Sequence, residues 1–276
     1  MNPVTLANGK EIEFSSPRIM GIVNCTPDSF AVRSDTPEKA IEAARKMIAE
    51  GADLLDIGGE SSRPGSKPVS LEEELRRVIP VIEGIRTFSE IPISIDTTKS
   101  AVARTALDTG ADIINDISAL TFDNRMSAIV RDYNCPVVLM HIKGIPKTMQ
   151  KAPFYDDVVQ EVGSYFQARI DFAVSHGIDK RKLILDIGIG FGKRTEDNLK
   201  LLKHLQRFAE FGLPLLVGAS RKRFIGEITG AETEDRLPGS ITVVALAVLN
   251  GANIIRVHDV AETKQAVDLA VALREV

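Results

Sequence analysis

An eightfold alternation of two kinds of segment is the feature that most constrains how this chain folds. Short apolar runs rich in Val and Ile recur, each followed by a polar or Gly-rich break and then by a longer segment with helical spacing. Near-continuous apolar runs of this length are typical of strands buried on both faces, and their alternation with helices predicts a parallel sheet. The eight predicted strands are residues 19–24, 54–58, 93–96, 113–117, 137–141, 183–187, 215–218 and 254–258.

The predicted helices follow these strands in order. They are residues 37–50, 70–89, 99–109, 123–133, 156–176, 196–211, 237–251 and 260–275. Thr36 suits an N-cap before Pro37, and glycines stand where left-handed C-caps are favoured, at 51, 110, 177, 212 and 251. Eight such units in about 250 residues match a (β/α)8 TIM barrel of the α/β class. An open doubly wound sheet is the alternative.

The segment before the first unit predicts a β-hairpin. Residues 4–6 and 11–14 flank an Asn8-Gly9 pair, which is a strong signal for a two-residue turn. We expect the hairpin, within residues 1–17, to close the bottom of the barrel. No linker-like or low-complexity tract divides the 276 residues, which predicts a single domain over 1–276.

Composition and charge exclude several functional classes. Lys and Arg number 34 against 38 Asp and Glu, a formal net charge of −4, so we expect neither nucleic acid nor an anionic membrane as a partner. No apolar run approaches the roughly 20 residues of a membrane span, and no signal sequence begins the chain, so we expect a cytoplasmic protein. Cys25 and Cys135 cannot make a disulfide framework, and the spacing of the four His residues disfavours a zinc hydrolase.

Polar residues stand at the carboxyl ends of the predicted strands, where a TIM barrel builds its active site. Any one of them alone could cap a helix or tie down a loop. Burying all of them costs free energy unless they pair or bind, so the set indicates a polar ligand. The set is Asn24, residues 58–65, Asp96-Thr97, Asn115-Asp116, His141, Asp186, residues 220–222, Arg256 and His258.

This set divides by chemistry. Asp96, Asn115 and Asp186 suit a flat heterocycle with amide and amino groups, such as a purine or a pterin. Cationic donors suited to phosphate are Arg63, Lys222, Arg256 and His258. A substrate that carries both a ring and a phosphate is therefore expected. Residues 186–193 fit neither a P-loop nor the G-x-G-x-x-G fingerprint, which leaves a tight loop that lets backbone approach the ligand.

With these residues in place, the chain closely resembles the dihydropteroate synthases, folate-pathway enzymes of the pterin-binding barrel family. The resemblance spans nearly the whole chain and consists of motifs in family order. They are residues 20–30 (MGIVNCTPDSF), 56–65 (DIGGESSRPG), 94–97 (SIDT), 115–117 (NDI), 140–141 with 146–150 (MH and PKTMQ), 190–193 (GFGK), 220–222 (SRK) and 256–259 (RVHD).

The resemblance implies a transferase that condenses 6-hydroxymethyl-7,8-dihydropterin pyrophosphate with 4-aminobenzoate, with Mg2+ on the departing pyrophosphate. It implies that Asp96, Asn115, Asp186 and Lys222 bind the pterin, that Met140 and Phe191 line its pocket, and that Arg256 stacks over it. Asn24 would hold Mg2+, and Ser62, Arg256 and His258 would bind the pyrophosphate, with Arg63 among the cations there. Phe30, Pro64 and Ser220 would border the aminobenzoate. The family also implies a homodimer through outer helices.

The chain departs from the family pattern at three places. Residues 31–35 (AVRSD) replace the usual Ser-Asp-Gly-Gly, Ile187 replaces Pro, and Arg223 stands where Ser is common. Arg223 could place a cation near a carboxylate or point to solvent. Two further functions stay open: a pterin-binding methyltransferase of the same superfamily with a corrinoid protein partner, and a non-catalytic pterin-binding protein. The phosphate-binding cations disfavour the methyltransferase.

Overall fold

Eight parallel strands close into a barrel in the computed structural model, which describes residues 2–26, 36–63 and 65–276. The order around the barrel is β10-β3-β4-β5-β6-β7-β8-β9, so each strand pairs with its predecessor in the chain and the last pairs with the first. This confirms the predicted TIM barrel and excludes the open sheet. The strands are β3 (Arg18–Asn24), β4 (Leu54–Gly58), β5 (Ile93–Asp96), β6 (Ile113–Asp116), β7 (Val137–Met140), β8 (Leu183–Asp186), β9 (Leu215–Val217) and β10 (Ile254–Val257).

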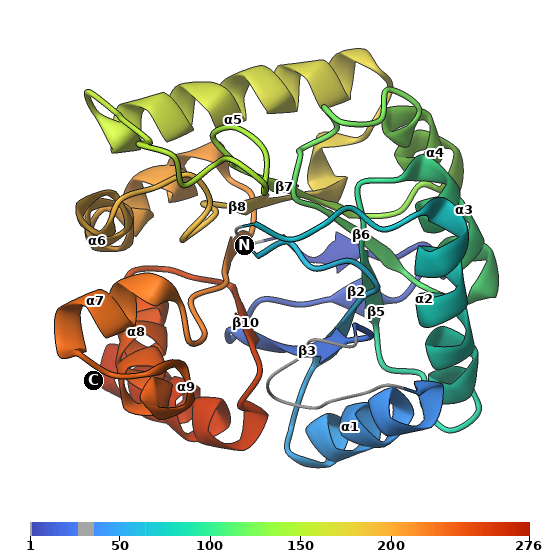
Figure 1. The fold of residues 1–276 in the computed structure, drawn as a ribbon, viewed down its shortest axis with the longest axis horizontal. Helices are drawn as coiled ribbons and strands as arrows, with labels where there is room; N and C mark the ends of the chain where they lie inside the picture. Colours follow the sequence, from blue (N-terminus) through green and yellow to red (C-terminus); the bar gives the residue numbers. More distant parts are fainter. Residues whose placement is uncertain (1, 27–35, 64) are drawn as a thin grey trace.

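Helices form a ring outside the strands (Figure 1). The α-helices are α1 (Pro37–Ala49), α2 (Leu71–Arg86), α3 (Ser100–Thr109), α4 (Met126–Tyr133), α5 (Val158–Ser175), α6 (Thr195–Lys203), α7 (Arg223–Thr229), α8 (Leu237–Leu249) and α9 (Val260–Arg274). Short 3-10 helices span Lys180–Lys182, Leu205–Phe211 and Thr233–Asp235. The main core lies between the strands and this ring.

The observed elements differ from the predicted ones at several boundaries, and helix starts and ends shift by up to three residues. Strands end up to one residue before the prediction because residues such as His141 and His258 turn out of the sheet into the site loops. The helix predicted over 196–211 is split at His204 into α6 and a 3-10 helix. Helix α7 was not predicted, since seven residues are too few to establish a helical period. Thr36 does occupy the N-cap before Pro37, but its side chain accepts no hydrogen bond from the helix.

The N-terminal hairpin plugs the barrel floor as expected. Strands β1 (Val4–Thr5) and β2 (Glu11–Ile12) pair antiparallel, and Gly9 at the turn has a φ of 84°. The predicted two-residue turn is wrong in length, because Leu6 N–H donates to the Lys10 carbonyl oxygen and three residues, 7–9, form the loop. Leu6 and Ile12 pack against residues at the amino ends of the barrel strands, among them Met20, Leu54 and Ile254. The active-site loops emerge at the opposite, carboxyl end.

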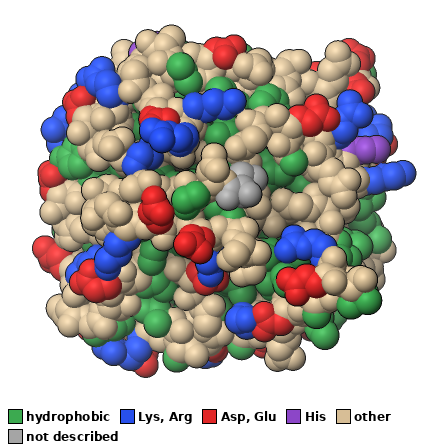
Figure 2. Space-filling model, turned by 180° about the vertical axis from the view of Figure 1, so that it is seen from behind, with side chains coloured by type: hydrophobic (Ala, Val, Ile, Leu, Met, Phe, Trp, Pro, Cys, Tyr) green, Lys and Arg blue, Asp and Glu red, His purple; other side chains and the backbone are tan. Residues whose placement is uncertain are grey.

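The exterior carries mixed charge. On the face shown in Figure 2, Lys and Arg side chains are interspersed with Asp and Glu, in keeping with the formal net charge of −4. No helix in the described ranges is long and apolar enough to cross a membrane.

Removing the apolar plug should destabilise the barrel. Leu6→Ala is expected to lower the free energy of unfolding by about 2 to 4 kcal/mol, because Leu6 is 2% exposed and its loss leaves a cavity. Urea denaturation followed by circular dichroism measures this. Glu13→Ala, an exposed change in the same segment, is the control and should shift stability by less than about 0.5 kcal/mol. If Leu6→Ala and Glu13→Ala changed the free energy of unfolding equally, the hairpin would not stabilise the barrel through its apolar contacts.

Candidate active site

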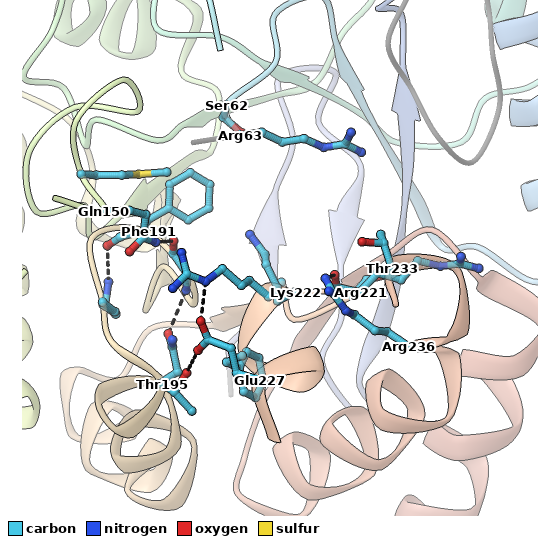
Figure 3. Close-up of a pocket in the computed structure, with 18 of the residues that line it drawn as sticks. Ser62, Arg63, Gln150, Phe191, Thr195, Arg221, Lys222, Glu227, Thr233 and Arg236 are labelled. Carbon is cyan, nitrogen blue, oxygen red and sulfur yellow. Dashed lines mark hydrogen bonds and ion pairs between the residues drawn. The ribbon is translucent and has the colours of Figure 1, made fainter. Parts of the chain in front are cut away.

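A cavity of about 960 Å³ opens at the carboxyl ends of the strands. The sequence-predicted residues that line it are Asn24, Ser62, Arg63, Asp96, Phe191, Ser220, Lys222, Arg256 and His258. In Figure 3, Lys222 lies across the cavity from Ser62 and Arg63. Asn115, Met140 and Asp186 are buried at the ends of β6, β7 and β8. Phe30, Pro64 and the altered segment 31–35 lie outside the described residues.

A buried ionic cluster spans the barrel interior at the base of this cavity. Arg256 on β10 donates from Nε to Asp56 Oδ2 (2.6 Å) and from a terminal nitrogen to Asp96 Oδ2 (2.8 Å). Asn115 Nδ2 also donates to Asp56 Oδ2 (3.0 Å). Burial disfavours the charge on Arg256, yet the two carboxylates hold the pKa of the guanidinium above its usual value. Four strands, β4, β5, β6 and β10, are thereby connected through side chains alone.

Asp56 belongs to this cluster but is not among the residues predicted at the strand ends. It lies in the middle of β4 rather than at its end, and its side chain has no exposed surface. The signal was present as a carboxylate inside an otherwise apolar strand, Leu54-Leu55-Asp56-Ile57. Such a residue must pair when it is buried, and the partner here is Arg256, 200 residues away in the sequence.

Three buried oxygen atoms within the described part of the chain lack a hydrogen-bond partner. They are Asp56 Oδ1, Ser94 Oγ and Asn115 Oδ1. The strand register brings their residues together, because Asp56 pairs with Ser94 and Asp96 pairs with Asn115. Buried polar atoms are normally satisfied, so this group is suited to a ligand rich in N–H donors.

A tight loop after β8 positions Asp186 and Phe191. Asp186 Oδ1 accepts a hydrogen bond from the Gly188 N–H (2.7 Å). Gly188 has a φ of 63°, and a Cβ there would lie 1.9 Å from the His141 carbonyl oxygen. A glycine is therefore required, because the loops after β7 and β8 touch backbone to backbone. The expected approach of this backbone to a ligand stays a prediction, and the close approach that the structure shows is to the neighbouring loop.

Lys193 joins the same two loops through a buried ammonium group. Its Nζ donates to the carbonyl oxygens of Gly188 (2.8 Å), Phe191 (3.1 Å) and His141 (3.2 Å), and lies 2.9 Å from His141 Nδ1. Burial lowers the pKa of Lys193 to about 7. Burial and the Lys193 charge also hold the pKa of His141 well below its usual value, so the ring is neutral and accepts.

One wall of the cavity is apolar. Met140 and Phe191 belong to a small cluster with Ile117, Ile142 and Met149. The ammonium of Lys222 lies 4.3 Å from the centre of the Phe191 ring, in reach of a cation–π interaction. A flat ring bound between this wall and Arg256 would have acceptors at its edge and cations at its rim.

Burial brings the pKa values of Asp96 and Lys222 closer together. Desolvation raises the pKa of Asp96 to about 7, although Arg256 opposes the shift. Desolvation, assisted by Arg256, lowers the pKa of Lys222 to about 8. Burial also raises the pKa of Asp186, opposed by the Gly188 N–H and by Lys222. Perturbed pairs of this kind are typical of functional sites.

His258 is neutral in the free protein, contrary to the expectation that it is a cationic donor. Burial, followed by the nearby charge of Arg256, lowers its pKa to about 3. Its Nδ1 lies 3.0 Å from Ser220 Oγ, and its Nε2 lies 3.5 Å from Asn24 Nδ2. The three predicted residues Asn24, Ser220 and His258 thus form one contact group. The imidazole can act there as a hydrogen-bonding group without charge.

Two other predicted positions have structural roles. Asp116 accepts hydrogen bonds from Ser118 and from the Leu120 N–H, so it organises its own loop and does not line the cavity. Arg223 pairs with Glu227 at 2.5 Å and its side chain is 74% exposed. Glu227 also accepts from Thr195, which gives a bridge between α7 and α6 (Figure 3). Arg223 also lines the outer part of the cavity, so the structure leaves both interpretations of this residue open.

Comparison with known proteins extends over nearly the whole chain. The family model described as "Pterin binding enzyme" matches residues 20–258. The dihydropteroate synthase of Escherichia coli (strain K12) is 48% identical over 263 residues, which are 94% of this chain and 93% of that protein.

Solved structures give the same result. A dihydropteroate synthase of Xanthomonas albilineans with 4-aminobenzoic acid is 48% identical, has a TM-score of 0.92, and the match covers 99% of this chain and 98% of that one. A structure of the Xanthomonas albilineans protein in complex with 7,8-dihydropteroate is 45% identical with a TM-score of 0.89, and the match covers all of both chains.

Removal of the Arg256 guanidinium should destabilise the protein, because two buried carboxylates then lack a cation. Arg256→Met is expected to lower the free energy of unfolding at pH 8 by about 3 kcal/mol, because Asp56 and Asp96 lose their cation. The loss should be smaller at pH 6, since the unpaired carboxyls then bind protons in the folded state. Urea denaturation at both pH values tests this.

The control for this measurement is Arg76→Met, which removes a largely exposed ion pair with Glu73. It should cost less than about 1 kcal/mol at either pH. A loss for Arg256→Met that is no larger than the control, or one that does not change with pH, would refute the dependence of the acids on Arg256.

Proposed function

The chain belongs to the dihydropteroate synthase family of pterin-binding enzymes, and from this premise we propose how its own residues condense 6-hydroxymethyl-7,8-dihydropterin pyrophosphate with 4-aminobenzoate. The products are 7,8-dihydropteroate and pyrophosphate. The observation that carries the proposal is the convergence on one cavity base of Asp96 and Asp186 from the ends of β5 and β8, Arg256 from β10, and Lys222 from the loop after β9.

The pterin is assigned to the base of the cavity. Its amino and ring N–H groups would donate to Asp96, Asp186 and Asn115, and Lys222 would donate to a ring acceptor. The unpaired oxygens of Asp56, Ser94 and Asn115 support this assignment, because a pterin supplies the donors that they lack. Met140 and Phe191 supply an apolar face for the ring, and Arg256 would stack on the other face.

The pyrophosphate is assigned to the rim, beside Ser62, Arg63, Arg256 and His258. Arg63 and Arg256 supply charge, while the neutral His258 and the Ser62 hydroxyl supply hydrogen bonds. Substrate binding would compete with the existing contact between Arg256 and Asp96, because the pterin needs the same carboxylate.

Asn24 fits the magnesium role assigned to it in one respect. Mg2+ takes oxygen ligands and is often held by one or two protein groups together with substrate phosphates. The Asn24 amide lines the cavity next to His258, so its oxygen could share the ion with the pyrophosphate. Within the described residues no group of three or more His, Cys, Asp or Glu could hold a metal without substrate. When bound, Mg2+ would neutralise charge on the departing pyrophosphate.

The reaction exchanges one bond at the pterin methylene for another. The C–O bond to pyrophosphate breaks and its electron pair leaves with the pyrophosphate oxygen. The lone pair of the aromatic amine forms the new C–N bond, and the amine then loses a proton to solvent. In a dissociative path the methylene carries positive charge, which the fixed carboxylates of Asp96 and Asp186 would stabilise. No strong base is required because the amine is already neutral at pH 7.

The aminobenzoate is assigned to the outer part of the cavity. Ser220 would border it, as would Phe30 and Pro64. Ser220 is 8% exposed and is held by His258. Arg223 lines the same cavity but pairs with Glu227, and this subsite is assigned without it.

A homodimer through outer helices is also proposed. Its support is three exposed leucines on two helices that pack against each other: Leu246 on α8, and Leu269 and Leu273 on α9. Apolar side chains grouped on a surface are typical of association sites. The cytoplasmic location stays a prediction from the sequence.

The proposal is tested by pyrophosphate release from the purified protein with dihydropterin pyrophosphate and Mg2+, with and without 4-aminobenzoate. Release that requires 4-aminobenzoate and yields dihydropteroate is expected. Asp96→Asn and Lys222→Ala should each lower turnover by more than about 100-fold, through lost electrostatic stabilisation, while the circular dichroism spectrum is unchanged. Full activity in either variant would refute the assigned roles. Tight pterin binding without release would indicate a binding-only protein.

The pH dependence of kcat/KM should be bell-shaped. Asp96, with a pKa of about 7, is ionised above that value, and Lys222, with a pKa of about 8, is protonated below that value. The rate should therefore rise as the pH passes 7, fall as it passes 8, and be highest between them. Lys222→Arg should remove the alkaline limb, since an arginine stays protonated. A flat profile from pH 6 to 9 would contradict the assignment.

A further inference from the structure

A second ionic cluster, outside the cavity base, joins helix α2 to two loops of the site. Lys99 Nζ donates to Glu74 Oε2 (2.5 Å) and also to Glu60 Oε2. The other oxygen of Glu74 accepts from Thr97 Oγ1 (2.6 Å). The Glu74 side chain is 1% exposed, so its charge depends on these partners.

The cluster connects two segments that the proposed function uses. Thr97 directly follows Asp96, and Glu60 lies two residues before Ser62 and three before Arg63. Glu60 itself lines the cavity. A single ammonium group therefore links the carboxyl end of β5 to the loop after β4.

The start of that loop is fixed independently. Arg77 on α2 donates to the Gly59 carbonyl oxygen (2.8 Å). A Cβ on Gly59 would lie 2.8 Å from Val78 Cγ1, so the loop leaves β4 in close contact with α2. The contact between Glu60 and Lys99 comes one residue after Gly59 and directly before residues 61–63.

From this geometry we propose that Lys99 is a positioning residue. It holds the Glu60–Arg63 loop in the position from which Ser62 and Arg63 would bind the pyrophosphate. This inference rests on the proposed function, because the pyrophosphate is the ligand of that loop. Although burial disfavours charge on Lys99, its hydrogen bonds to Glu60 and Glu74 hold its pKa above the usual value. The ammonium is therefore present across the working range of pH.

The test compares two ligands that differ only in the pyrophosphate. Lys99→Met keeps the apolar stem and removes the ammonium. Calorimetry should show affinity for dihydropterin pyrophosphate weakened by about tenfold, and unchanged affinity for 6-hydroxymethyl-7,8-dihydropterin. A general loss of structure would weaken both ligands, which would overturn the proposal, as would unchanged affinity for both. Lys99→Arg should restore most of the lost affinity.

Glu60→Gln is the second variant, because it loosens the link to the loop and leaves the pair of Lys99 with the buried Glu74 intact. It should weaken pyrophosphate-ligand binding in the same direction by about threefold. Lys46→Met removes an ion pair with Glu50 on α1 and is the matched control, with no effect on either ligand.

Calorimetry measures binding and does not require turnover. The proposed function and the positioning role of Lys99 can therefore be refuted independently. Wild-type protein that releases no pyrophosphate with 4-aminobenzoate would refute the function while the ligand difference still tests Lys99. Active wild-type protein with unchanged ligand affinities in both Lys99→Met and Glu60→Gln would refute only the positioning role.

Discussion

The pairing of Arg256 with Asp56 and Asp96 is the interaction on which the arrangement of this site depends. Backbone hydrogen bonds in a barrel join only neighbouring strands, and β10 neighbours β3 and β9. The guanidinium of Arg256 instead reaches across the interior to β4 and β5. Two buried carboxylates and their cation thus stabilise one another where each alone would be costly. Asn115 donates to the same Asp56 carboxylate, beside the unpaired oxygens that the strand register brings together.

The loops on the two sides of the cavity are held by different physical means. After β7 and β8 the backbones touch at Gly188 and Gly192, and the ammonium of Lys193 binds the carbonyl groups that converge there. After β4 and β5 the loops are held by side-chain charges, with Lys99 between Glu60 and Glu74. The first side carries the apolar wall with Phe191, and the second carries Ser62 and Arg63, which line the cavity. The apolar side is consequently built on close-packed backbone, and the other side depends on ion pairs.

Much of the fold and part of the site could be predicted from local sequence. Each barrel strand begins within one residue of its predicted start, and Asn24, Asp96 and Asp186 are the last residues of their strands. For the adjacent pair Asn115 and Asp116, the sequence could not predict which side chain points into the barrel. Successive strand side chains point to opposite faces, so only one of the two enters the barrel. In strands that are apolar on both faces the sequence carries no sign of which one that is. Asn115 enters the barrel, and Asp116 binds its own loop.

Two acids were missed for a related reason. Asp56 and Glu74 both lie within regular elements, where a charge interrupts an apolar strand or the buried stripe of α2 that continues with Val78, Val81 and Ile82. The interruption is visible in the sequence, whereas the partners are not, because Arg256 and Lys99 are distant along the chain.

The sequence by itself determined the number and order of the βα units, the plugging hairpin and the family, since these depend on local periodicity and on motifs. Only the tertiary structure decided which charges neutralise one another and which groups titrate away from their usual pKa. Ionisation depends on burial and on neighbours brought together by barrel closure, and no local pattern specifies either.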